Sequence, residues 1–166
     1  EASVAPGNYL VLGSTGLVGS HALMALKDRE GVNVRAVAHR RKTNVSGKNI
    51  SYVKADLMDP KACKRVMEGI DYVLMYAGVL STAPVIARNP IEPVTASLII
   101  TVQALEAAYH AGASKFIWLS STTGYPPLEE RLDEDRMFEG DPPDVYYPVG
   151  WMTRYLETQC KMYSDK

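Results

Sequence analysis

The sequence has few of the features that mark secreted, metal-binding or membrane proteins. It contains two cysteines among 166 residues, Cys63 and Cys160, and neither belongs to a metal-ligand spacing or a disulfide framework. No signal peptide is visible, and the longest apolar runs are far shorter than a membrane span. The net charge of −1 shows no basic excess, so nucleic acid is not an expected partner. These absences predict a cytoplasmic protein with no membrane or nucleic-acid partner and no metal.

What is present is an alternation of apolar runs rich in β-branched residues with helical patterns. We expect strands at about 9–12, 32–38, 50–54, 71–76 and 115–120, and helices at about 18–27, 61–68, 93–110 and 149–164. Asp59 and Pro60 mark a helix start, and Gly112 marks a helix end. The order predicts one α/β domain over residues 1–166: a Rossmann-like, doubly wound parallel sheet with helices on both faces. The proline-rich, acidic stretch 125–148 is expected to be a long loop.

Three glycines follow the first predicted strand with the spacing G-x-x-G-x-x-G, and a helical pattern begins among them. Glycine removes the Cβ, which permits positive φ and lets a pyrophosphate approach the backbone N–H groups. The partial positive charge of a helix N-terminus acts on the same anion. This strand–turn–helix context predicts a dinucleotide site. The residues expected to hold the cofactor here are Gly13, Ser14, Thr15, Gly16, Leu17, Val18 and Gly19.

The residues after the second and third strands bear on the choice of dinucleotide. A carboxylate that ends the second strand selects NAD, but this strand runs into His39, Arg40, Arg41 and Lys42, with no carboxylate in reach. Clustered cations suit a 2′-phosphate, so the pattern favours NADP, with NAD possible. A solvated basic loop is the alternative. Asp56 and Leu57 follow the third strand, where such folds often place an adenine contact; an aspartate that only closes a loop is equally consistent.

The chain resembles the extended short-chain dehydrogenase/reductases, the NAD-dependent epimerase/dehydratase family that acts on nucleotide sugars. The resemblance covers essentially all 166 residues and rests on segments 13–19, 55–57, 76–78, 104–108, 116–126 and 150–151. Segment 116–126 is most similar to the GDP-fucose synthase branch. The resemblance implies that Tyr76, Ala77 and Gly78 also line the cofactor site.

The family resemblance implies hydride transfer between the nicotinamide and a sugar carbon. In such enzymes a tyrosine is the general acid or base, and a lysine four residues later lowers its pKa. A serine or threonine after the fifth strand binds the reacting oxygen. Ser121, four residues before Tyr125, matches that serine. A hydroxyl that only caps the backbone is the alternative for Ser121.

The tyrosine–lysine pair is where this sequence departs from the family. Aligning Gly150 and Trp151 with the usual Tyr-Gly-Trp-Ser-Lys pattern puts Val149 at the tyrosine and Thr153 at the lysine. No Tyr-x-x-x-Lys occurs anywhere in the chain, and Ser97 stands at the position of a family asparagine.

Tyr147, two residues upstream of Val149, is the candidate for a relocated base, with Arg154 or a solvent network in place of the lysine. A packing or substrate-facing role is the alternative for Tyr147. Two functions therefore stay open. One is a nucleotide-sugar epimerase, dehydratase or reductase that uses NADP(H). The other is a dinucleotide-binding sensor or scaffold that has lost catalysis.

The resemblance also implies a smaller, C-terminal substrate lobe, for which this sequence has no candidate. We expect either a fragment or a minimal cofactor-binding domain. Relatives pair the last helices of two subunits, so a homodimer through the C-terminal helix is a further expectation. The side chains expected on one face of that helix are Met152, Tyr155, Leu156, Cys160 and Tyr163. Packing of this stripe on the chain's own sheet is the alternative.

Overall fold

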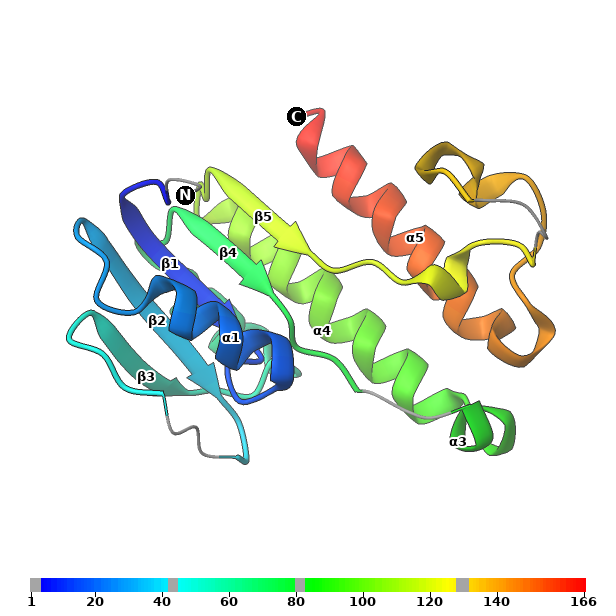
Figure 1. The fold of residues 1–166 in the computed structure, drawn as a ribbon, viewed down its shortest axis with the longest axis horizontal. Helices are drawn as coiled ribbons and strands as arrows, with labels where there is room; N and C mark the ends of the chain where they lie inside the picture. Colours follow the sequence, from blue (N-terminus) through cyan, green and yellow to red (C-terminus); the bar gives the residue numbers. More distant parts are fainter. Residues whose placement is uncertain (1–3, 42–44, 80–82, 128–131) are drawn as a thin grey trace. The chain divides into compact units, whose positions relative to one another are not determined.

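The computed structural model describes residues 4–41, 45–79, 83–127 and 132–166. The chain forms two compact units (Figure 1). The first comprises residues 1–77 and 103–119, and the second comprises residues 78–102 and 120–166. Chain segments that are far apart in the sequence therefore build each unit.

The first unit contains a five-stranded sheet in which every pair of neighbouring strands is parallel. Its strands are β1 (Gly7–Leu12), β2 (Val32–Ala38), β3 (Ile50–Lys54), β4 (Tyr72–Met75) and β5 (Lys115–Trp118). Their order across the sheet is β3-β2-β1-β4-β5. The chain order thus reverses at β1, which pairs with β2 on one side and β4 on the other. The Rossmann-like, doubly wound α/β fold predicted from the sequence is confirmed.

Helices cover both faces of this sheet. On one face, α1 (Leu17–Leu26) buries Leu23 and Leu26 against side chains of β1 and β2. On the other face, α2 (Pro60–Met67) packs over β2. Arg35 of β2 connects the two elements, since its side chain donates at 2.8 Å to the carbonyls of Val66 and Glu68 at the end of α2. The Asp59 side chain accepts from the Lys61 amide at 2.9 Å, so the predicted N-cap of α2 is confirmed.

The long helix α4 (Ile91–His110) runs through both units (Figure 1). In the first unit it buries Ala104, Leu105, Ala107 and Ala108, and Gly112 then ends it with a φ of +75°. Among the described residues it is the one helix whose length and composition would suffice to cross a membrane. The expectation that no apolar run reaches that length was therefore wrong. The buried small side chains explain the composition, since helices that pack inside proteins are also apolar.

The second unit is helical. It contains α3 (Ala83–Arg88), the first part of α4 and α5 (Tyr147–Ser164). Three short 3₁₀ helices complete it: η1 (Thr122–Gly124), η2 (Glu134–Phe138) and η3 (Asp144–Tyr146). The stretch 125–148, predicted as a loop, therefore contains η2 and η3, and the sequence pattern missed α3.

Arg154 of α5 holds the segments of the second unit together. It is 3% exposed. Its Nε donates to the carbonyl of Gly124 in η1 at 2.8 Å, and its Nη2 donates to the carbonyl of Gly140 after η2. The guanidinium also lies 4.9 Å from the ring centroid of Trp151 and 5.2 Å from that of Phe138. These contacts order a stretch that a polar, proline-rich sequence does not order by itself.

Candidate functional site

The turn from Gly13 to Gly19, called the glycine turn below, lies at the carboxyl end of β1. The strand order reverses there, and open α/β sheets bind their ligands at such a point. Gly13 has a φ of +78°, and a Cβ there would lie 2.6 Å from the carbonyl oxygen of Tyr76 and from the amide of Ala77. A Cβ on Gly19 would lie 2.2 Å from the carbonyl oxygen of Gly13. Both glycines are therefore required for the close approach of β1, β4 and α1.

The start of α1 offers N–H groups to a ligand. Gly16 is its N-cap and supplies no side-chain hydrogen bond, so the first amides of the helix are not capped by a side chain. Gly16, Leu17 and Val18 are exposed, and Thr15 is half-buried. The backbone of this turn can therefore hold an anion such as a pyrophosphate, as the spacing predicts.

The Ser14 side chain has a structural role within the turn. Its side chain is fully buried, and its Oγ donates at 2.7 Å to the carbonyl of Val37 in β2. This bond fixes the turn to the neighbouring strand, so the Ser14 hydroxyl is not directed to a ligand.

Replacing Ser14 by alanine is expected to lower the free energy of unfolding by about 1–2 kcal/mol, because the buried carbonyl of Val37 would lose its partner. Denaturant titration followed by circular dichroism measures this. Ser20→Ala, which removes an exposed hydroxyl, is the control and should change the stability by less than about 0.5 kcal/mol. Equal effects of the two changes would contradict the structural role of Ser14.

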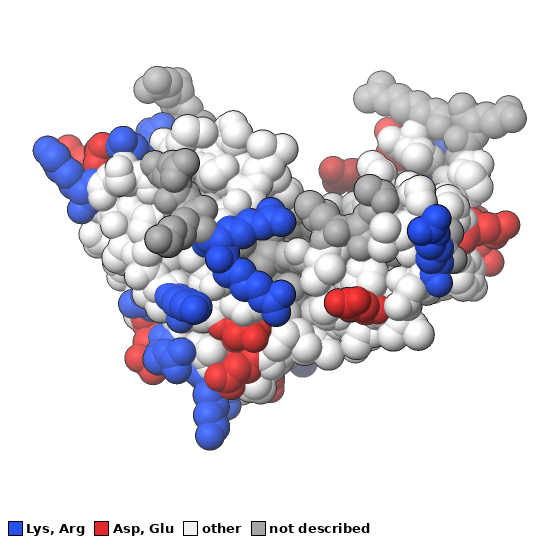
Figure 2. All heavy atoms as spheres, turned by 90° about the horizontal axis from the view of Figure 1, so that it is seen from below, with Lys and Arg blue, Asp and Glu red and all other residues white. Residues whose placement is uncertain are grey.

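His39, Arg40 and Arg41 follow β2 and are exposed; Lys42 lies outside the described residues. Figure 2 shows Lys and Arg side chains gathered on the first unit, with Asp and Glu side chains beside them. The expectation that no carboxylate is in reach was wrong, because Asp56 Oδ2 lies 3.6 Å from His39 Nε2. Sequence distance hid this pair, since parallel pairing of β2 with β3 brings the two strand ends together.

Asp56 and Leu57 form the turn after β3. Asp56 Oδ1 accepts from the Met58 amide at 2.9 Å, so the carboxylate closes its own loop and also presents its second oxygen to His39. Leu57 is buried, and its carbonyl accepts from the Gln103 side chain at 3.2 Å. The loop-closing interpretation of Asp56 therefore has direct support, while its Oδ2 stays available at the strand end.

The segment after β4 begins as an extension of the sheet. The Tyr76 amide donates to the Leu12 carbonyl at 3.0 Å, and Ala77 packs its backbone against Gly13. Burial raises the pKa of the Tyr76 phenol. In the second unit Gly78 is exposed, and Ser97 Oγ accepts from the Val79 amide at 3.0 Å. Ser97, at the family asparagine position, thus anchors the chain that leaves β4.

Ser121 caps the 3₁₀ helix η1 in the second unit. Its Oγ accepts from the Thr123 amide at 3.3 Å and lies 2.9 Å from Thr123 Oγ1. The capping role weighed for this hydroxyl is therefore present. The same residue lines a hollow of about 490 Å³, together with Ser120, Thr122, Tyr125, Glu134 and Glu157. Although Ser121 caps η1, it still lies on a surface that a ligand can reach.

Two carboxylates line this hollow, and of these Glu157 was not predicted from the sequence, while Glu134 belongs to the acidic stretch that was considered as a mouth of the substrate site or a solvated loop. Glu157 of α5 accepts a hydrogen bond from Ser120, and Glu134 belongs to η2. Burial and, after it, the charges of Glu157, Glu134 and Asp135 raise the pKa of the Tyr125 phenol. Tyr125 therefore stays protonated at neutral pH and acts as a hydrogen-bond donor. The sequence did contain a signal for Glu157: it comes four residues after Thr153, so the two residues lie on one face of the same helix.

The positions of the family tyrosine and lysine carry no proton chemistry in α5. Val149 is half-buried, and Thr153 is 1% exposed. A Cβ on Gly124 would lie 3.2 Å from Thr153 Cγ2, so this threonine packs on η1. Among the buried side chains of the described residues, Thr153 Oγ1 is the polar atom without a hydrogen-bond partner. That Val149 and Thr153 stand where the family has its tyrosine and lysine stays a prediction.

The structure does not support Tyr147 as a relocated base. Tyr147 begins α5, is 45% exposed and meets Trp151 edge to face, with ring centroids 6.2 Å apart. Residues two positions apart on a helix point in nearly opposite directions, so Tyr147 does not share a face with Val149. Arg154, proposed in place of the lysine, is committed to the carbonyls of Gly124 and Gly140.

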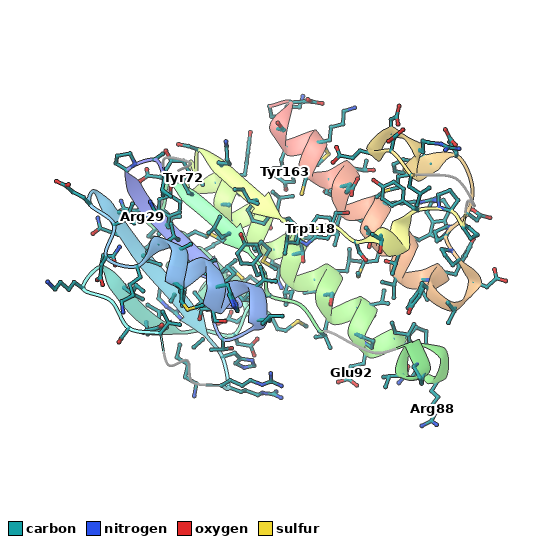
Figure 3. The ribbon with its side chains drawn as sticks, viewed as in Figure 1. Arg29, Tyr72, Arg88, Glu92, Trp118 and Tyr163 are labelled. Atoms are coloured by element: carbon teal, nitrogen blue, oxygen red, sulfur yellow. The ribbon has the colours of Figure 1, made fainter. Side chains whose placement is uncertain are left out.

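A second hollow, of about 380 Å³, lies at the amino ends of the strands and is lined by Tyr9 and Arg35 among others. The ring centroids of Tyr9 and Tyr72 are 4.7 Å apart, and Figure 3 labels Tyr72, the first residue of β4. The polar side chains of this hollow hold the fold together: Arg35 donates to two carbonyls at the end of α2, and Asn49 donates to carbonyls of α1 and β2. Because it lies away from the carboxyl ends of the strands, it is not the dinucleotide site. Within the described residues no group of three His, Cys, Asp or Glu side chains could hold a metal ion.

Comparison with known proteins decides the family. The profile of the NAD dependent epimerase/dehydratase family matches residues 9–165. The chain belongs to this family. A UDP-glucose 4-epimerase from Erwinia amylovora is 29% identical in an alignment 128 residues long that covers 71% of this chain and 38% of that protein. The chain thus spans about two fifths of the length of this family member.

Two solved structures share the fold. One is the UDP-N-acetylglucosamine 4-epimerase from Methanobrevibacter ruminantium in complex with UDP-N-acetylmuramic acid, with a TM-score of 0.81 and 22% sequence identity. The alignment covers 98% of this chain and 52% of the epimerase chain. MoeE5 in complex with UDP-glucose and NAD has a TM-score of 0.78 at 23% identity, over 96% of this chain and 50% of its own. The resemblance to the GDP-fucose synthase branch in particular stays a prediction.

Proposed function

We propose that this chain binds a nicotinamide dinucleotide along the turn from Gly13 to Gly19 and serves a reaction on a nucleotide sugar: an epimerase, dehydratase or reductase step. The exposed start of α1, whose first amides no side chain caps, is the observation that carries the proposal, because backbone N–H groups at a helix N-terminus can hold an anion. Membership of the NAD dependent epimerase/dehydratase family supports it. So do MoeE5, solved with UDP-glucose and NAD, and the UDP-glucose 4-epimerase relative.

In the proposed function, residues of the first unit hold the coenzyme and residues of the second unit contact the sugar. The first amides of α1 would hold the pyrophosphate, and the ends of β2 and β3 would hold the adenosine half. When bound, the nicotinamide would accept or return the hydride. In the second unit Ser121 and the protonated phenol of Tyr125 supply hydrogen bonds to a sugar oxygen. The phenol–ammonium pair of the family has no counterpart, so any proton transfer here uses an atypical arrangement.

Titration calorimetry of the purified chain with NAD⁺, NADH, NADP⁺ and NADPH tests the cofactor part. We expect binding, with the 2′-phosphorylated forms bound more tightly. Absence of heat with all four coenzymes would contradict the proposal.

Arg40 and Arg41 are proposed to favour NADP over NAD. The double change Arg40→Ser, Arg41→Ser is expected to weaken NADP⁺ binding about tenfold while NAD⁺ binding changes less than twofold, since two charge-assisted contacts to a phosphate would be lost. Arg29→Ser, a basic residue beyond the end of α1, is the control. An equal loss for both coenzymes would show that these arginines act only through general charge.

A sensor or scaffold is the second candidate, and one observation favours it. Thr153 is 1% exposed and packed on η1, so the lysine position is filled by a side chain with no charge. A chain that binds the dinucleotide yet transfers no hydride with UDP-glucose or UDP-N-acetylglucosamine would favour this candidate over the enzyme.

A homodimer through α5 is a further proposal. The stripe expected to mediate it is partly wrong, because Leu156 is buried. The exposed large side chains of α5 are Tyr147, Trp151, Tyr155 and Met162. Four side chains on about one face of a helix can pair with a second copy. Size-exclusion chromatography with light scattering should show a dimer, and a monomer at high concentration would remove the proposal.

A further inference from the structure

A thin stretch of chain packs over the first half of α5 in the second unit. We call this stretch, residues 132–146 with η2 and η3, the strap. Met137 is 2% exposed and Pro142 is buried, but most other side chains of the strap are exposed. The backbone hydrogen bonds within η2 and η3 join residues only three apart, and the bond from Tyr125 Oη to the Glu134 carbonyl is long, at 3.4 Å. A segment with few buried side chains and mostly local bonds can open while the rest of a protein stays folded.

The strap touches η1 and α5 at two glycines. A Cβ on Gly124 would lie 3.2 Å from Met137 Cε and 3.2 Å from Thr153 Cγ2, so these two side chains meet at Gly124. A Cβ on Gly150 would lie 2.3 Å from Pro142 Cβ, so the strap also lies directly on the backbone of α5. These contacts cover the face of α5 that carries Thr153, which is 1% exposed.

Arg154 holds the strap to α5. It is 3% exposed, its Nη2 donates to the Gly140 carbonyl, and its guanidinium lies 5.2 Å from the ring centroid of Phe138. Its Nε donates at 2.8 Å to the Gly124 carbonyl, which fixes the guanidinium in place. Because the planar fork of arginine serves both carbonyls at once, a lysine here could not make the same pair of bonds. Arg154 therefore stabilises the closed strap.

The closed strap leaves a buried hydroxyl without a partner. Thr153 Oγ1 is the polar atom without a hydrogen-bond partner among the buried side chains of the described residues. A hydroxyl that has lost water and gained no bond destabilises the arrangement that buries it. When the strap moves off α5, water reaches this hydroxyl. Thr153 therefore favours the open strap, in opposition to its neighbour Arg154.

We propose that the strap opens and closes over α5 while the sheet unit stays folded, with Arg154 favouring the closed form and Thr153 the open form. Opening uncovers the face of α5 around Thr153, so a ligand that contacts this face reaches it in the open form. The inference goes beyond the proposed function, because the motion requires neither coenzyme nor sugar.

Oxidation of Met137 by dilute hydrogen peroxide, measured by mass spectrometry of peptides, tests the inference. The sulfur of Met137 is buried under the closed strap, so its oxidation to the sulfoxide reports the open fraction. Met24, 51% exposed, gives the rate of an accessible methionine, and Met75 in β4, 1% exposed, is the reference for the first unit.

Four proteins are compared: the unchanged chain, Arg154→Lys, Thr153→Val and Glu139→Gln. In Arg154→Lys the Met137 rate should rise at least about tenfold, since a buried charge-assisted bond to the strap is lost. Thr153→Val should lower the rate about fivefold, because valine keeps the shape and removes the unbonded hydroxyl. Glu139→Gln breaks an exposed ion pair of the strap with Arg136 and, as the control, should change the rate by about twofold or less.

The Met75 rate should stay the same in all four proteins. An unchanged Met137 rate in Arg154→Lys, or one that does not fall in Thr153→Val, would overturn the inference. An equal rise at Met75 in Arg154→Lys would also overturn it, because the whole chain would then be unfolding. Circular dichroism checks the helices of each variant, and Thr153→Val decides alone if Arg154→Lys does not fold. The assay contains no coenzyme and no sugar, so a failure of the proposed function leaves its result unchanged.

Discussion

Replacing Val149 by tyrosine and Thr153 by lysine in one variant is expected to raise the rate of hydride transfer from a nucleotide sugar to the bound coenzyme by about 100-fold, the lower end of what a positioned general base contributes. The two residues are four positions apart on α5 and therefore share a face. A lysine at 153 would lower the pKa of a phenol at 149, as an adjacent cation does. The measurement is nicotinamide absorbance after addition of UDP-glucose or UDP-N-acetylglucosamine.

The control is Val149→Phe with Thr153→Met, which adds similar bulk at both positions without proton chemistry. It matters because Thr153 packs on Gly124, so a larger side chain has to displace η1. We expect the control to bind coenzyme like the unchanged chain and to show no gain in rate. An unchanged chain that already turns over as fast as the Tyr–Lys variant would show that the missing pair does not limit the reaction.

Gly19→Ala is expected to lower the free energy of unfolding by about 3 kcal/mol, although alanine at a helical glycine normally adds about 1 kcal/mol of stability. The added Cβ would lie 2.2 Å from the Gly13 carbonyl oxygen and 3.0 Å from the Ser14 Cα, both backbone atoms that cannot rotate away. The helix α1 would have to move off the turn, so dinucleotide binding should be lost with the stability. Denaturant titration and calorimetry measure the two effects.

Gly16→Ala is the matched control for this prediction. Gly16 has a φ of −82°, which alanine adopts, and its Cβ would come no closer than 3.3 Å to the Gly13 carbonyl oxygen. Its stability should change by about 1 kcal/mol or less, the size of an N-cap effect. Because Gly16 lies at the exposed start of α1, its Cβ should still weaken coenzyme binding. Similar stabilities of the Gly19 and Gly16 variants would contradict the packing role given to Gly19.

The sheet could be predicted because its signals are local. Runs such as Val32–Ala38 carry their own pattern of buried and exposed residues, and Asp59 with Pro60 marks a helix start within two residues. The helix α3 was missed because it has only six residues, one of them a proline, and gives no periodicity to detect. The turns η2 and η3 were missed because Arg154, far along the chain, helps to order that stretch through the Gly140 carbonyl.

The site was predicted where a single segment builds it and missed where two segments meet. The glycine turn is one segment, and its geometry agrees with the spacing. The contact of His39 with Asp56 depends on β2 pairing with β3, and the contact of Ser120 with Glu157 depends on how α5 packs in its unit. The sequence contains these residues but does not state which of them become neighbours. The bond of the Ser14 hydroxyl to Val37 is non-local as well, so the sequence did not indicate it; Ser14 as a cofactor contact stays a prediction.

The most direct test is to record amide chemical shifts of the ¹⁵N-labelled chain as NADP⁺ is added. The proposed site predicts that the largest changes fall on the amides of Gly16, Leu17 and Val18 at the start of α1, followed by those of His39 to Arg41. Saturating shifts confined to other parts of the chain, or no shifts at millimolar coenzyme, would contradict the account.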